Sequence, residues 1–351
     1  MSTDYSRKLI DKLKKYHTLT ASEFTELLEN CNPDIAEYLY EKARQVQSEH
    51  YKNHIYIRGL IEYTNYCKND CYYCGIRASN RNATRYRLDK DTILACCETG
   101  YRLGFRTFVL QGGEDPYFTD ARMIEIVSAI RNQYPDCAIT LSIGEKSYET
   151  YEALYQAGAN RYLLRHETHN ATHYSQLHPS SLTASNRQDC LWNLKKIGYQ
   201  VGTGFMVGSP YQTTEHLVED LLFIKELNPQ MVGIGPFICH HDTPFAKEKS
   251  GDFKLTLFLI GLLRLMIPKL LLPATTALGT IDSMGRELGI LAGANVVMPN
   301  LSPAKVRENY SLYDNKLCTG DESAELLNEL KRRISKIHYE IISDIGDSKN
   351  M

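Results

Sequence analysis

The sequence has no excess of either charge, since its 351 residues contain 40 Lys and Arg against 42 Asp and Glu. A near balance gives no electrostatic preference for nucleic acid or for an anionic membrane surface, so we expect neither as a partner. The 24 tyrosines are scattered along the chain, and no basic stripe accompanies them. The composition therefore gives no sign of a nucleic-acid-binding surface.

The sequence also lacks an uninterrupted apolar segment that could cross a membrane. Its most apolar stretch, "LTLFLIGLLRLMIPKLLLPA" at 255–274, is interrupted by Arg264, Pro268 and Lys269. Because a spanning helix needs roughly 20 mostly apolar residues, this stretch predicts a buried helix followed by a buried strand. The first twenty residues are polar and charged, without the apolar region of a secretory signal, so we expect a cytoplasmic protein.

A disulfide framework is not expected either, although the chain contains ten cysteines. Disulfides are rare in cytosolic proteins, where scattered cysteines behave as small buried hydrophobes. Seven cysteines fit that role: Cys31, Cys96, Cys97, Cys137, Cys190, Cys239 and Cys318. The other three lie together in the polar segment "NYCKNDCYYCGIRASN", where a purely structural cysteine has little to pack against.

No internal repeat or low-complexity linker divides the chain. Instead, strand-like and helix-like segments alternate after an N-terminal region of helical pattern. The strand candidates are residues 54–64, 106–113, 138–144, 161–167, 200–208, 231–237, 270–277 and 294–300. Parallel strands need helical crossovers, so this order predicts a (β/α)8 barrel of the TIM type, with an open doubly wound sheet as the alternative. We expect an N-terminal helical extension at 1–53, the barrel at 54–310 and a C-terminal helical tail at 311–351.

Polar or unusual residues follow almost every predicted strand at its carboxyl end. In a barrel these ends share one face, whereas an open sheet gathers such residues at one switch point, so the pattern favours the barrel. In chain order they are Glu62 with three cysteines, Gln111 to Glu114, Ser142, Arg165 to Glu167, Met206, Pro236, Thr275 with Thr276, and Met298 to Asn300.

The three clustered cysteines, Cys67, Cys71 and Cys74, have three and then two residues between them. Structural zinc normally takes four protein ligands, and no second Cys-x-x-Cys or His-rich pair is visible to complete such a site. Three thiolates from one loop can instead hold three irons of a cubane cluster and leave the fourth iron open for chemistry. A chance zinc loop or unrelated cysteines are the alternative interpretations.

The spacing Cys-x3-Cys-x2-Cys, with Tyr73 before the third cysteine, resembles the signature of radical S-adenosylmethionine enzymes. In those enzymes the cofactor chelates the open iron, and an electron from the cluster yields a 5′-deoxyadenosyl radical. "QGGED" at 111–115 resembles their Gly-Gly-Glu motif for the methionyl amine, and a tight turn is its structural alternative. Arg165 and Glu167 end an apolar strand, where charge is costly unless paired or used, so a buried ion pair is their alternative role.

Several motifs in sequence order resemble the HydE family, the radical S-adenosylmethionine maturases of FeFe-hydrogenase. They are "LQGGEDPY" (110–117), "RYLLRHETHN" (161–170), "MVGIGPFICHHDTPFA" (231–246), "PATTALGT" (273–280) and "GANVVMPN" (293–300). The resemblance runs from about residue 54 to about residue 318, with the cysteine loop in register. It implies a (β/α)8 barrel that generates a 5′-deoxyadenosyl radical to process a small organo-iron, cysteine-derived precursor of the dithiomethylamine bridge.

The resemblance also assigns roles to residues and names partners. The cluster would be one 4Fe-4S group bound by the catalytic cysteines Cys67, Cys71 and Cys74. S-adenosylmethionine would contact Gln111, Ser142, Glu167, Arg187 and Met206. The substrate cavity would be lined by Arg165, Thr275, Thr276 and Met298. The partners would be the organo-iron substrate, a sister radical maturase, a GTPase scaffold and a reductant protein such as ferredoxin or flavodoxin.

The chain departs from this family in two places. Some relatives carry three further cysteines near the C-terminus for a second cluster, but only Cys318 aligns with them here, so we expect no second cluster. Gly112 stands where some relatives have serine, which leaves that contact open.

Other activities remain as alternatives. A biotin-synthase-like sulfur insertion should need an auxiliary cluster, and Cys239 alone cannot hold one. A methylornithine-synthase-like mutase shares the cysteine loop and the "GEDP" turn, while "RHETHN" and "PATTALGT" weigh against it. An iron–sulfur carrier without catalysis would not need polar groups at eight strand ends.

Overall fold

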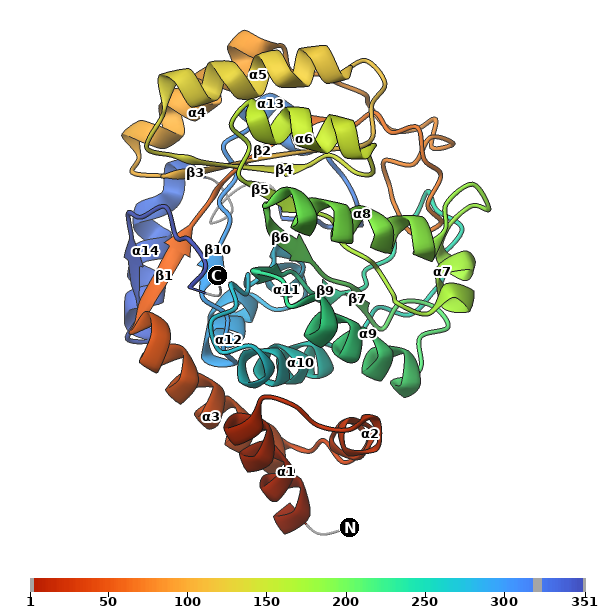
Figure 1. Ribbon diagram of the computed structural model, residues 1–351, viewed down its shortest axis with the longest axis vertical. Coiled ribbons are helices and arrows are strands. Elements are labelled where there is room, and N and C mark those ends of the chain that lie inside the picture. The colour runs from red at the N-terminus through yellow and green to blue at the C-terminus, as the bar shows by residue number, and fades with distance from the viewer. Residues whose placement is uncertain (1–2, 318–323, 350–351) are drawn as a thin grey trace.

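The computed structural model describes residues 3–317 and 324–349 of the chain (Figure 1). Three helices come first: α1 (Thr3–Tyr16), α2 (Ala21–Glu29) and α3 (Pro33–Tyr51). Thr20 caps α2 through a capping box with Glu23, and Asn32 caps α3 just before Pro33. The helix α3 packs against α10 (Phe253–Met266), where Gly261 lets Leu39 approach closely.

Parallel strands follow these helices. The first predicted strand is divided at Arg58 into β1 (His54–Ile57) and β2 (Gly59–Thr64). The other strands of the barrel are β3 (Thr107–Gly112), β4 (Ala138–Ser142), β5 (Arg161–Leu163), β6 (Gln200–Thr203), β7 (Met206–Val207), β8 (Met231–Val232), β9 (Gly235–Pro236) and β10 (Val296–Val297). The main sheet has the parallel order β2-β3-β4-β5-β6-β8.

The sheet closes on itself into a barrel. A parallel bridge joins Met231 of β8 to Leu271, and another joins Pro273 to Val296 of β10. The strand β10 then pairs with β1, with Tyr56 opposite Val296. This closure confirms the predicted (β/α)8 barrel and excludes the open sheet. The predicted strand at 270–277 is reduced to these two bridges, because proline cannot donate to a ladder and α11 begins at Thr276.

Helices surround the strands as the outer layer (Figure 1). They are α4 (Lys90–Arg102), α5 (Asp120–Gln133), α6 (Tyr148–Gln156), α7 (Ala171–Leu177), α8 (Ala184–Ile197), α9 (Thr214–Leu227), α10, α11 (Thr276–Ile281), α12 (Gly285–Leu291), α13 (Ala304–Arg307), the 3-10 turn η2 (Ala324–Leu326) and α14 (Leu327–Lys336). Side-chain caps from Asp89, Ser147 and Thr183 fix where three of the crossovers start.

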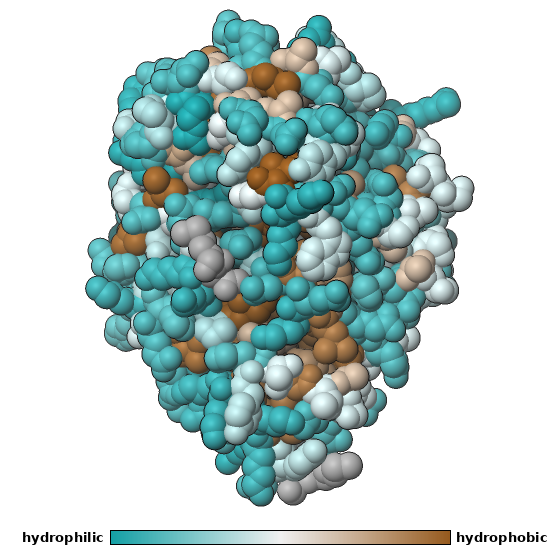
Figure 2. Space-filling view, in the orientation of Figure 1, coloured by the Kyte–Doolittle hydropathy of each residue, from teal (hydrophilic) through white to brown (hydrophobic). Residues whose placement is uncertain are grey.

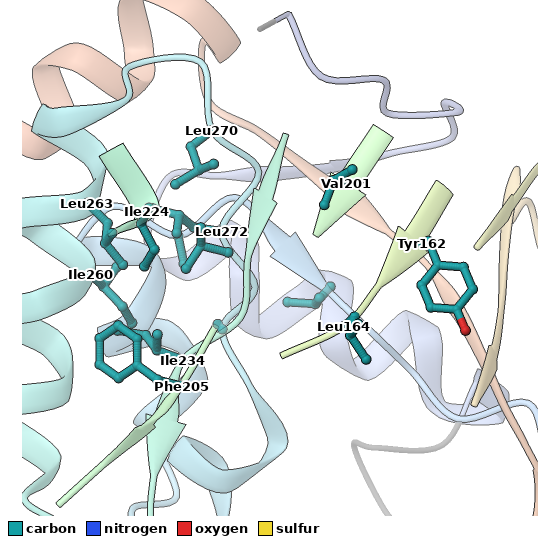
Figure 3. Close-up of a cluster of buried hydrophobic side chains, with 14 of the residues drawn as sticks. Tyr162, Leu164, Val201, Phe205, Ile224, Ile234, Ile260, Leu263, Leu270 and Leu272 are labelled. Carbon is teal, nitrogen blue, oxygen red and sulfur yellow. The ribbon is translucent and has the colours of Figure 1, made fainter. Parts of the chain in front are cut away.

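The core lies between the strands and these helices. Figure 3 shows Phe205, Ile234 and Leu272 facing Ile260 and Leu263 of α10, and all five side chains are buried. The helix α10 is the apolar stretch in which Arg264 occurs, and Arg264 donates hydrogen bonds to the carbonyls of Gly293, Pro268 and Leu270. In the described part of the chain, no helix has both the length and the apolar character that crossing a bilayer requires.

The end of the chain covers the amino-terminal end of the barrel. A strand that the sequence did not predict, β11 (Glu340–Ile342), pairs in parallel with β1. Asp347 then forms a 2.6 Å ion pair with Arg161 at the start of β5. The face shown in Figure 2 is mostly hydrophilic, with separate hydrophobic patches. Access to the barrel interior is therefore from the carboxyl ends of the strands.

Candidate active site

A cavity of about 380 Å³ occupies the carboxyl-terminal end of the barrel. All twelve side chains predicted to carry chemistry line it. They are Cys67, Cys71, Cys74, Gln111, Ser142, Arg165, Glu167, Arg187, Met206, Thr275, Thr276 and Met298. These residues come from segments spread over more than 230 positions of sequence, and the barrel brings their strand ends to one face.

The cysteine loop forms one wall of the cavity. It begins after β2 and packs on α7, where the amide of Tyr72 donates to the carbonyl of Leu177 at 2.9 Å and Tyr73 Oη lies 3.1 Å from His178 Nε2. Burial lowers the pKa of His178 to about 3, so this imidazole is neutral at physiological pH. On this side the loop is thus held by a backbone hydrogen bond and a neutral side-chain contact, and its three cysteines line the cavity.

The three thiols form a set that a metal cluster fits. Burial, with a smaller contribution from the nearby Cys67 thiol, raises the pKa of Cys74 to about 12. Burial also raises the pKa of Cys71 well above its ordinary value, with Cys74 and Cys67 adding to the effect. Three buried thiolates repel one another unless cations share their charge, and iron in a cubane supplies those cations. The residues present therefore fit a cluster held by three cysteines.

The turn after β3 is shaped to lie against this loop. A Cβ atom on Gly113 would lie 2.2 Å from the carbonyl oxygen of Tyr66 and 2.7 Å from Cβ of Cys67, so only glycine fits. A Cβ atom on Gly112 would lie 2.8 Å from Cγ2 of Thr64, which requires a local shift for any larger residue. The carbonyl of Glu114 accepts a hydrogen bond from the amide of Lys68 at 2.9 Å. The two predicted motifs are therefore one structural unit.

Three charged residues of the cavity lining form ion pairs. Arg165 Nη2 lies 3.0 Å from Glu167 Oε2, and Arg187 Nε lies 2.7 Å from Glu145 Oε1. Neither contact has the alignment of a hydrogen bond, and these atoms have no other hydrogen-bond partner in the described residues. Glu167 also has a φ of 63°, a left-handed conformation that costs a residue with a side chain about 1–3 kcal/mol. Arg165, Glu167 and Arg187 therefore take part in ion pairs and also line the cavity.

Not every strand-end residue lines the cavity, and His166 is an example. His166 is completely buried, with Nδ1 2.8 Å from Thr203 Oγ1 and Nε2 3.2 Å from Asp220 Oδ1. Its position between Arg165 and Glu167 explains this, because alternate residues of an extended segment point to opposite sides. His166 follows β5 as the sequence predicted, but its side chain is buried away from the cavity and is structural.

The lining of the cavity contains an unsatisfied hydroxyl. Thr275 Oγ1 is buried and has no hydrogen-bond partner within the described ranges. Thr275 precedes α11 but makes no side-chain capping bond, whereas Thr276 is the first residue of that helix. A buried hydroxyl without a partner costs stability, so its orientation towards the cavity points to a ligand that accepts or donates a hydrogen bond.

Sequence reasoning missed a buried ionic group in the cavity lining. Lys316 Nζ lies 2.9 Å from Glu62 Oε1, and Asn300 Nδ2 donates to Glu62 Oε2 at 2.8 Å. Glu62 and Asn300 were recognised as strand-end residues, but Lys316 comes from a segment 254 positions away and carries no local signal. Other lining residues that sequence reasoning did not single out include Arg286, Tyr310, Leu312 and Tyr313.

The chain is similar to known proteins over nearly its whole length. A family model described as "Radical SAM superfamily" matches residues 61–224. The sequence is 40% identical to the FeFe hydrogenase maturase subunit HydE of Thermotoga maritima over 345 residues, 98% of each chain. It is 30% identical to 3-methylornithine synthase of Methanosarcina barkeri over 319 residues, 90% of this chain and 89% of the relative.

Solved structures agree on the fold. The crystal structure of methylornithine synthase (PylB) superposes with a TM-score of 0.83 at 28% identity, over 95% of this chain and 97% of the other. The crystal structure of HydG, a maturase of the FeFe-hydrogenase, gives a TM-score of 0.80 at 20% identity, over 97% of this chain and 76% of the other. At that identity the second similarity concerns the fold alone.

Proposed function

The chain belongs to the HydE family of radical S-adenosylmethionine enzymes, and from this premise we propose that it acts in maturation of the FeFe-hydrogenase H-cluster. The substrate is a small organo-iron, cysteine-derived precursor of the dithiomethylamine bridge. The observation that carries the proposal is the single cavity in which three cysteines, a Gly-Gly-Glu turn and an unsatisfied threonine hydroxyl meet. The 40% identity to HydE over the whole chain supports the same function.

The family uses a 4Fe-4S cluster and S-adenosylmethionine. When bound, these groups supply the 5′-deoxyadenosyl radical. In this chain Cys67, Cys71 and Cys74 would hold the cluster. The surrounding protein excludes water and keeps the reacting groups in one orientation, which is its usual contribution to cofactor chemistry.

We assign the cofactor to the side of the cavity next to the cysteine loop. Glu167 and Arg187 present charged atoms there that lack aligned hydrogen bonds, so they can serve the amino and carboxylate groups of S-adenosylmethionine. Gln111 and Ser142 end neighbouring strands in register with each other, and Met206 lines the same wall. All five are cavity residues that the family resemblance assigns to this cofactor.

The substrate is assigned to other residues of the same lining. Arg165 offers a cation, Met298 an apolar and polarisable surface, and Thr275 with Thr276 lies between them in the lining. A substrate with anionic ligands such as carboxylate or cyanide matches a cation beside hydroxyl donors. The unsatisfied Thr275 hydroxyl supports this assignment most directly.

The proposal includes one cluster per chain, a cytoplasmic location, and the partners expected from the sequence. Those partners are a sister radical maturase, a GTPase scaffold, and a ferredoxin or flavodoxin as reductant. Cys318, which aligns with a second-cluster ligand of some relatives, lies outside the described residues. The absence of further cysteines near it in the sequence supports a single cluster.

We expect Glu167→Gln to weaken S-adenosylmethionine binding by roughly 10–100-fold, because a hydrogen bond to a charged group is worth about 1.5–3 kcal/mol. Isothermal titration of the reconstituted enzyme measures this affinity. The melting temperature should stay close to that of the wild type, since the change keeps the size of the side chain. Unchanged affinity combined with a large loss of melting temperature would assign Glu167 to a structural ion pair with Arg165.

A second candidate function is methylornithine synthesis. It is supported by the 30% identity to 3-methylornithine synthase and by the TM-score of 0.83 to PylB. The two functions differ in substrate, since a mutase acts on a free amino acid. Incubation with lysine and detection of methylornithine tests this alternative directly.

A further inference from the structure

One arginine, Arg85, forms hydrogen bonds with the backbone of the cysteine loop from the segment that follows the loop. The chain returns along β2 after the loop, where Thr64 and Arg87 form an antiparallel bridge and the amide of Leu88 donates to the carbonyl of Tyr63. Asn65 holds this returning segment in place. Its side chain accepts a hydrogen bond from the amide of Tyr86 at 2.8 Å and donates one to the carbonyl of Thr84 at 2.8 Å. The side chain of Arg85 thereby points back into the loop that it follows.

The guanidinium of Arg85 donates to four carbonyl oxygens of the loop. Nη1 donates to Asn65 at 2.5 Å and to Ile76 at 2.9 Å. Nη2 donates to Arg77 at 2.7 Å and to Asn80 at 3.0 Å. These acceptors lie on both sides of the three cysteines in sequence. A planar fork with fixed donors can join four such carbonyls, whereas the compact ammonium of lysine cannot.

The charge of Arg85 differs from that of two neighbouring arginines. Arg77 is neutralised by Asp70 at 2.5 Å and Arg87 by Asp115 at 2.7 Å. No carboxylate in residues 3–317 or 324–349 forms an ion pair with Arg85. Arg85 and Cys67 line the same outward-facing pocket of about 350 Å³, so the charge lies beside a cysteine of the proposed cluster.

We propose that Arg85 is the positioning residue of the cysteine loop and also sets the reduction potential of the cluster. Its four hydrogen bonds hold the loop in the conformation that presents three thiols to one centre. Its uncompensated charge stabilises the reduced cluster, which carries one more negative charge than the oxidised cluster, and so makes the potential less negative. This inference rests on the proposed function only in that a cluster binds to the three cysteines.

The test compares three variants after anaerobic reconstitution, with the wild type as reference. Arg85→Lys keeps the charge but loses the fork, so the cluster should be released to a chelator roughly 10–100-fold more readily, the usual cost of losing such a supporting contact. The potential of the cluster that remains, measured by redox titration with electron paramagnetic resonance, should be nearly unchanged. Arg85→Gln should release iron as readily and also shift the potential to a more negative value.

Arg81→Gln is the matched control, because Arg81 is an exposed arginine of the same pocket and its charge is screened by water. It should change neither iron retention nor potential. Wild-type iron retention and potential in both Arg85 variants would overturn the proposal. If Arg85→Gln fails to fold, the Arg85→Lys variant is sufficient for the test. A rate of iron loss equal to that of the wild type in this variant would then overturn the proposal. A wild type that binds no cluster would instead contradict the proposed function, which keeps the two failures separate.

Discussion

Replacing Cys67, Cys71 and Cys74 together by alanine is expected to reduce the iron content after anaerobic reconstitution from about four per chain to nearly zero. The visible absorption of the cluster and its response to S-adenosylmethionine should disappear with it. The fold should persist, because the thiols lie on a loop that Arg85, Asn65 and the contact of Tyr72 with Leu177 hold independently of any metal. Iron analysis, absorption and circular dichroism measure these three outcomes.

Cys97→Ala provides the control for this experiment. Cys97 is completely buried in α4 and does not line the cavity, so its removal should leave the iron content unchanged. Four irons retained by the triple variant would show that the cluster is bound elsewhere. Eight irons in the wild type would contradict the single-cluster proposal, since three cysteines can hold only one cubane.

The second large effect is expected at the two threonines assigned to the substrate, Thr275 and Thr276. Thr275→Val combined with Thr276→Val keeps the shape of both side chains and removes both hydroxyls. A lost hydrogen bond in a buried site costs about 1–3 kcal/mol, so binding of the substrate should weaken at least roughly tenfold and hydrogenase maturation should fall sharply. Cluster content and S-adenosylmethionine affinity should remain, because neither threonine is among the residues assigned to the cluster or to S-adenosylmethionine. An in vitro maturation assay of the hydrogenase measures the loss.

Stability gives this prediction a further constraint. Thr275 Oγ1 has no partner and no capping role, so its replacement by valine should leave the melting temperature equal or higher. Thr140→Val is a matched control, because Thr140 Oγ1 is also buried without a partner in the described residues but lies outside the cavity. It should have the same small effect on stability and none on maturation. Full maturation by the double valine variant would remove these threonines from the substrate site.

The parts of the site that could be predicted are those encoded by local spacing. Cys67, Cys71 and Cys74 lie within eight residues, and the glycines at 112 and 113 mark a close approach that the structure shows against Tyr66. The barrel could be predicted because eight strand-like segments alternate with helices, and its closure brings their carboxyl ends together. These features depend on short-range pattern and on one topological rule.

The parts that could not be predicted depend on contacts between distant segments. Lys316 reaches Glu62 across 254 positions, and nothing in its neighbourhood distinguishes it from a surface lysine. The strand β11 is visible only through its pairing with β1, since three residues carry too little periodicity. His166 shared its motif with two cavity residues, and only the direction of its side chain separated it from them.

The most direct test of the proposed function is the substrate that triggers cleavage of S-adenosylmethionine. The reconstituted protein is reduced and incubated with S-adenosylmethionine and either an organo-iron cysteine species or lysine, and 5′-deoxyadenosine is measured by liquid chromatography. The proposal predicts that the organo-iron species stimulates 5′-deoxyadenosine formation well above the level without substrate, while lysine does not. Stimulation by lysine with formation of methylornithine, and no response to the organo-iron species, would contradict it.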